Sequence, residues 1–101
     1  MPLYNDEKWG FVKYRARGGI CTIQVGVYGI GANSGWKVPL AMPVQFLPDM
    51  AFYAPLAHRQ SNNVAQLWVP KKDGEDPFLY VYTQVETNRD NSVNGIVSYP
   101  Y

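Results

Sequence analysis

Runs in which apolar and polar residues alternate cover much of this chain, and a period of two is typical of β-strands with one buried face. Turn-forming segments rich in glycine, proline or charge separate these runs, and no helical pattern of useful length occurs between them. The predicted strands are residues 11–16, 20–28, 36–40, 50–56, 64–69, 78–85 and 95–99. The pattern predicts an all-β domain, either a small antiparallel β-barrel or a sandwich with a jelly-roll-like arrangement.

Alternation also divides the side chains of each strand between an inner and an outer face. If Leu67 and Val81 point inward, then Trp68, Tyr80 and Tyr82 point outward. The residues expected inward are Val12, Tyr14, Ala16, Cys21, Ile23, Val25, Val27, Met50, Phe52, Ala54, Leu56, Ala65, Leu67, Val69, Leu79, Val81 and Val85.

Residues 1–8 are polar and aperiodic, so we expect a linker or the stub of a preceding region. Residues 9–101 are then a single domain, because a chain of 101 residues is large enough for one core. The first residues lack the basic and apolar regions of a signal peptide. No apolar run approaches the length of a membrane span.

The formal net charge is only +1, so no broad field favours nucleic acid or an anionic membrane. Cys21 is the only cysteine, which rules out an internal disulfide and a Cys-based zinc site. With one histidine and no nucleophile motif, we expect no enzyme, metal or cofactor. The carboxylates do not have the spacing of a calcium loop, and nothing places them as a glycosidase pair; they are Asp49, Asp73, Glu75 and Asp76.

The outward set of Trp68, Tyr80 and Tyr82 is an apolar patch of the kind that marks an interface. Such rings stack on the C–H faces of a pyranose, which would make the patch a saccharide platform. They also pack well between the subunits of an oligomer. The sequence leaves both interpretations open.

Two polar loops supply donors and acceptors that suit sugar hydroxyls. If the strands run up and down in order, loops 29–35, 57–63 and 86–94 lie at one end of the domain. The candidate saccharide ligands in these loops are His58, Arg59, Gln60, Asn62, Asn63, Arg89, Asp90 and Asn91. The alternative is that these loops are ordinary solvated hairpin tips.

A series of weak motifs covers nearly the whole chain in a fixed order. They are Trp9, Tyr14-Arg15, Gly18-Gly19, the strand 20–25, Met42-Pro43, Phe46-Leu47-Pro48, the strand and Asp-Gly turn at 67–74, and the closing residues 97–101. In this order the chain resembles the receptor-binding head domains that end phage tail fibres and baseplate proteins. It departs from them with Leu47 in place of the usual arginine, Met42 in place of leucine, and a charged insertion at 71–77.

The resemblance implies a homotrimer at the distal tail tip or baseplate of a virion, attached to other tail proteins through an N-terminal shaft. It implies binding to a host cell-wall or capsular saccharide, with a site near a subunit boundary. Two other functions remain open, a structural tail-tip or oligomerisation module and, with less support, a small hydrolase.

Overall fold

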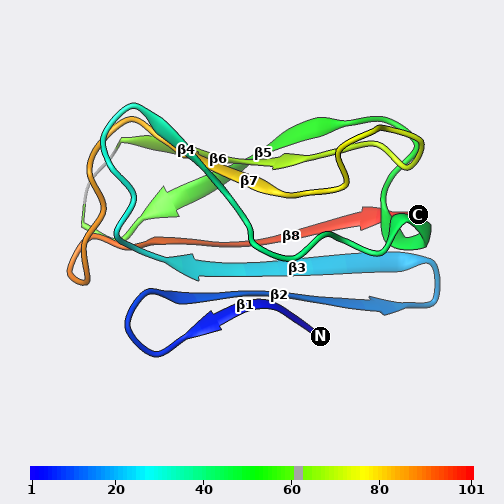
Figure 1. The fold of residues 1–101 in the computed structure, drawn as a ribbon, viewed down its shortest axis with the longest axis horizontal. Coiled ribbons are helices and arrows are strands. Elements are labelled where there is room, and N and C mark those ends of the chain that lie inside the picture. Colours follow the sequence, from blue (N-terminus) through cyan, green and yellow to red (C-terminus); the bar gives the residue numbers. More distant parts are fainter. Residues whose placement is uncertain (61–62) are drawn as a thin grey trace.

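The computed structural model describes residues 1–60 and 63–101, and in them the chain is one antiparallel sheet that curls on itself (Figure 1). The sheet order is β1-β2-β3-β8-β5-β6-β7-β4. A three-residue 3-10 helix, η1, lies in the connection between β4 and β5. The elements are β1 (Pro2–Asp6), β2 (Gly10–Arg17), β3 (Ile20–Val27), β4 (Ser34–Lys37), η1 (Val44–Phe46), β5 (Phe52–His58), β6 (Val64–Val69), β7 (Tyr80–Thr83) and β8 (Val93–Pro100).

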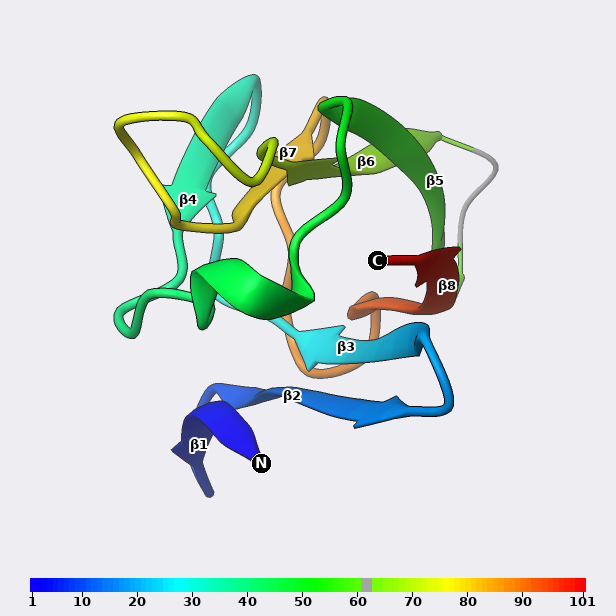
Figure 2. The same cartoon turned by 90° about the vertical axis from the view of Figure 1, so that its right-hand side faces the viewer.

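The curl of the sheet begins where β5 meets β8. These strands share only two residue pairs, Ala57↔Asn94 and His58↔Val93, whereas β8 pairs with β3 along its whole length. Beyond the two pairs β5 separates from β8, so β5, β6, β7 and β4 lie across from β1, β2, β3 and β8 (Figures 1 and 2). The result is a half-barrel in which β1 and β4 are the two edge strands.

The core fills the space between the two halves of the sheet and confirms most of the predicted inner face. Predicted inner-face residues that are buried are Val12, Tyr14, Cys21, Ile23, Val25, Val27, Ala54, Leu56, Ala65, Leu67, Val69, Leu79 and Val81.

The predicted tight turn between β2 and β3 is also present. Both Gly18 and Gly19 have positive φ, as this turn requires.

The proline-rich connection from β4 to β5 covers one end of the half-barrel (Figure 2). It buries Val38, Met42 and Leu47 in the core. The Tyr99 hydroxyl of β8 donates a hydrogen bond of 2.8 Å to the carbonyl oxygen of Phe46 in η1. Burial raises the pKa of Tyr99, so this hydroxyl keeps its proton and the connection stays tied to the sheet.

Several predicted boundaries are wrong. Residues 2–6 are the edge strand β1, with Leu3 buried against the core, and not part of a linker. Met50 precedes β5 and is 79% exposed, so it does not belong to the inner face. The strand predicted at 36–40 begins earlier, at Ser34, and β7 is shorter than predicted. The strands also do not follow an up-and-down order, because β8 lies between β3 and β5.

We predict that Leu3→Ala lowers the free energy of unfolding by about 2–3 kcal/mol, because it removes buried methyl groups and leaves a cavity. Urea denaturation measures this value. Met50→Ala is the matched control, since it removes a similar apolar mass from an exposed position and should cost less than about 0.5 kcal/mol. Equal and small effects of the two substitutions would show that β1 does not contribute to the core.

Candidate functional site

Four aromatic side chains form a continuous group on the outer face of β5, β6 and β7. Strand register aligns Tyr53 with Trp68, and Trp68 with Tyr80. The ring centroids are 4.7 Å apart for Tyr53 and Trp68, and 6.1 Å apart for Tyr80 and Tyr82, which are stacked. We call Tyr53, Trp68, Tyr80 and Tyr82 the aromatic surface. The predicted outward placement of Trp68, Tyr80 and Tyr82 is therefore confirmed.

The rings of the aromatic surface are accessible in the chain. Tyr53 is 56% exposed and Tyr82 is 37% exposed, whereas Trp68 and Tyr80 are half-buried between their neighbours. The Tyr80 hydroxyl donates a hydrogen bond of 2.8 Å to Asp76, and this bond raises the pKa of Tyr80. Tyr80 is thus fixed by a hydrogen bond to the charged segment 71–77, while the rings of Tyr53 and Tyr82 are more exposed.

Gly35 of β4 sets the position of Tyr82. The two residues are paired in register, and a Cβ atom at Gly35 would collide with the Tyr82 ring. The ring therefore lies over the backbone of the edge strand, where a larger residue would displace it.

A hollow of about 440 Å³ adjoins the aromatic surface at Tyr82. Amide side chains come from Asn33, Gln66 and Gln84, and none of the described residues that line the hollow is charged. We call it the amide hollow. Amides both donate and accept hydrogen bonds, so an aromatic ring beside them suits a neutral ligand that carries hydroxyl groups.

Three loops meet at one end of the half-barrel, although the up-and-down strand order from which we expected this is wrong. Thr87 exchanges backbone hydrogen bonds with Gly29 and Ile30 at 3.1 and 2.8 Å. Arg59 N–H donates to the carbonyl oxygen of Ser92 at 2.9 Å, and Gln60 N–H donates to Asn91 Oδ1 at 3.0 Å. These bonds hold the segments 28–33, 59–60 and 84–92 together.

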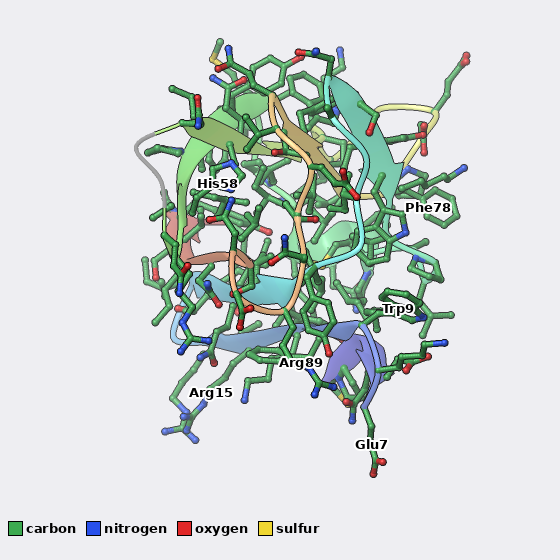
Figure 3. The ribbon with its side chains drawn as sticks, turned by 90° about the vertical axis from the view of Figure 1, so that its left-hand side faces the viewer. Glu7, Trp9, Arg15, His58, Phe78 and Arg89 are labelled. Carbon is green, nitrogen blue, oxygen red and sulfur yellow. The ribbon has the colours of Figure 1, made fainter. Side chains whose placement is uncertain are left out.

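The candidate polar ligands at this end do not join Trp68. Arg59 and Arg89 line a depression of about 430 Å³ with Asp6 and Glu7, which give it mixed charge. Figure 3 shows Arg89 at the surface near β2. Trp68 lies four residues beyond the start of β6, about 13 Å from this end at the usual rise of a strand. The predicted set is thus split between two surfaces.

Two further members of the predicted set are Asp90 and Asn62. Asp90 lies in the same exposed loop as Arg89, where its N–H donates to Asn88 Oδ1 at 3.0 Å. The prediction for Asn62 falls outside the described residues. The described contacts do not place Asp90 against the aromatic surface.

The prediction of His58 as a loop ligand is wrong. His58 is the last residue of β5, in phase with the buried Ala54 and Leu56, and is only 6% exposed (Figure 3). Its Nε2 atom is 3.2 Å from the Thr83 hydroxyl, which donates to the carbonyl oxygen of Val85 at 2.8 Å. His58 therefore links β5 to β7 inside the fold.

The described part of the chain contains no group of three or more His, Cys, Asp or Glu residues placed to hold a metal ion. Within the same residues, no helix is long and apolar enough to cross a membrane. Comparison of the chain with protein-family models, with curated proteins and with solved structures gave no match.

Tyr53 and the amides Gln66 and Gln84 are not among the site residues predicted from the sequence. Gln66 lies two residues before Trp68, and Gln84 lies two residues after Tyr82. Because residues two apart in a strand share a face, alternation already placed both glutamines on the outer face. Their grouping needed the register that sets Gln66 opposite Tyr82.

We predict that Gly35→Ala destabilises the protein by about 1–3 kcal/mol, because the new methyl group collides with Tyr82. In the Tyr82→Ala background the same substitution should cost clearly less, since the ring is gone. Urea unfolding of the four proteins of this double-mutant cycle gives the coupling energy. Additive effects would contradict the proposed contact.

Thr83→Val should lower the free energy of unfolding by about 1–3 kcal/mol, because it removes the hydrogen-bond partner of buried His58. Thr22→Val is the matched control, since the Thr22 hydroxyl contacts Ser98 at an exposed position. The control should change stability by less than about 0.5 kcal/mol in the same urea titration. A Thr83→Val protein as stable as the control would place His58 outside any structural role.

Proposed function

We propose that the protein is a saccharide-binding receptor head of the kind that ends phage tail fibres and baseplate proteins. The observation that carries the proposal is the aromatic surface beside the uncharged amide hollow. The order of motifs along the chain, from Trp9 to Tyr101, supports the same family of functions.

The chemistry of these two surfaces matches that of a neutral sugar. The C–H faces of a pyranose pack on exposed rings such as Tyr53 and Tyr82, whose flat apolar bodies lose little conformational freedom on binding. The amides of Gln66 and Gln84 donate to and accept from sugar hydroxyls. Each such hydrogen bond contributes ~1 kcal/mol net, so one sugar binds weakly to one chain.

In the proposed assembly the head is a homotrimer at the tail tip or baseplate of a virion, and its ligand is a cell-wall or capsular saccharide of the host. Three copies in one trimer, and several trimers on one tail, turn weak sites into firm attachment by raising the effective concentration. The absence of a strong net charge fits a neutral ligand.

A second candidate function is an oligomerisation module without a receptor site of its own. The outer face also carries Val64, which is 52% exposed and lines the amide hollow together with Tyr82. Exposed apolar groups in one area are typical of a surface that another protein subunit covers. One substitution, Trp68→Ala, distinguishes the two functions.

Trp68→Ala tests the proposal when oligomeric mass and binding to a panel of bacterial cells are measured together. We expect the wild-type protein to sediment as a trimer and the variant to stay trimeric while binding to cells falls. Ile96→Ala on β8 is the control, since it removes an exposed apolar side chain away from the aromatic surface.

If the variant dissociates, the aromatic surface is a subunit interface and the oligomerisation module is the better description. Unchanged cell binding by a trimeric Trp68→Ala protein would remove Trp68 from the site. A wild-type species of 11.4 kDa at micromolar concentration would contradict the trimer.

A further inference from the structure

A second pocket opens where the half-barrel fails to close, between the β1–β2 side and the edge strand β4. Its volume is about 350 Å³, at the small end of the range for ligand pockets. Four aromatic rings from four different segments line it: Tyr4 of β1, Trp9 of the β1–β2 turn, Tyr28 after β3, and Trp36 of β4. We call this pocket the edge cleft.

The four rings are held in two pairs. Tyr4 and Trp36 meet edge to face with centroids 4.9 Å apart, and this contact bridges the two edge strands. Trp9 and Tyr28 have centroids 6.0 Å apart. Gly29, with φ of +89°, leaves room for the Trp9 ring, which a Cβ atom would displace. Trp9, labelled in Figure 3, is still 41% exposed, so its ring is fixed in place but partly open to a ligand, with Lys8 Nζ 4.9 Å from the ring centroid.

The edge strand adds backbone polar groups to this aromatic lining. Val38 N–H bonds to Leu79 of the neighbouring segment, and alternation along β4 turns the N–H and C=O of Gly35 toward the open edge. Burial raises the pKa of Tyr4, so its hydroxyl remains a donor at neutral pH. None of the described residues that line the cleft is charged, but Lys8 Nζ lies over the Trp9 ring, 4.9 Å from its centroid.

The edge cleft and the amide hollow share a wall. Ser34 and Gly35 line both, so the two recesses lie on either side of the same short strand. We propose that the edge cleft is a second saccharide subsite, which takes another sugar unit of the same neutral chain as it passes around the edge of β4. This inference rests on the proposed saccharide-binding function and names its ligand as a neutral oligosaccharide of at least two units.

The test is two-dimensional NMR of the full, isotope-labelled chain. The indole N–H signal of each tryptophan shows whether a ligand binds near that side chain. Trp9 and Trp36 report the edge cleft, and Trp68 reports the aromatic surface. The probes are methyl glycosides of glucose, galactose, N-acetylglucosamine and rhamnose, with glucuronic acid as the charged comparison. We expect at least one neutral probe to shift the indole N–H signals of Trp9 and Trp36, and glucuronic acid to shift both signals less than that neutral probe does, because the described lining residues are uncharged and Lys8 is a cation beside Trp9 alone.

Trp9→Ala should weaken binding at the Trp36 signal about tenfold, which corresponds to about 1.4 kcal/mol. Trp9→Phe should retain part of the affinity, which separates loss of the ring from loss of the fold. Tyr53→Ala is the matched control, since it removes an exposed ring from the aromatic surface and should leave the shifts of Trp9 and Trp36 unchanged.

If a neutral probe shifts Trp68 but leaves Trp9 and Trp36 in place, the edge cleft is not a subsite and the proposed function stands. If Trp9→Ala leaves the affinity at Trp36 unchanged, the subsite is likewise overturned. If no probe moves any of the three signals and the protein binds no cells, both the subsite and the proposed function fail.

Discussion

Strand alternation in β6 and β7 is the constraint on which both the core and the candidate surface depend. Leu67 and Val81 are fully buried, and they are aligned across the two strands. Because successive side chains point to opposite faces, the burial of this pair forces Trp68 and Tyr82 outward. A slip of one residue would bury the aromatic rings and expose the aliphatic ones, so the core fixes the surface.

The local pattern predicted those parts of the fold that depend on neighbouring residues. It placed β6 correctly at residues 64–69, the two-glycine turn at Gly18-Gly19, and the alternating inner face of β3. It failed where long-range pairing decides the outcome. Residues 2–6 carry no alternation of their own and become a strand because β2 offers an edge. We predicted His58 in a loop because it is polar and is followed by polar residues. Its spacing from Ala54 and Leu56, which puts all three on the same face of β5, was the better guide.

The candidate site was likewise predictable only in the features that depend on neighbouring residues. Alternation alone placed Trp68, Tyr80 and Tyr82 on one face, since it is a property of each strand. The amide hollow could not be predicted, because it depends on β4 lying beside β7 at the far end of the sheet order. The same reason explains why Arg59 and Arg89 gather with Asp6 and Glu7, and not with the tryptophan.

The central claim, that the aromatic surface is covered by saccharide, is tested most directly by hydroxyl-radical footprinting with mass spectrometry. The protein is oxidised alone and then with neutral cell-wall polysaccharide from bacteria that it binds. The account predicts that Tyr53 and Tyr82, the more open rings, are oxidised in the free protein and protected by polysaccharide. Equal oxidation of both tyrosines in the two samples would contradict the claim.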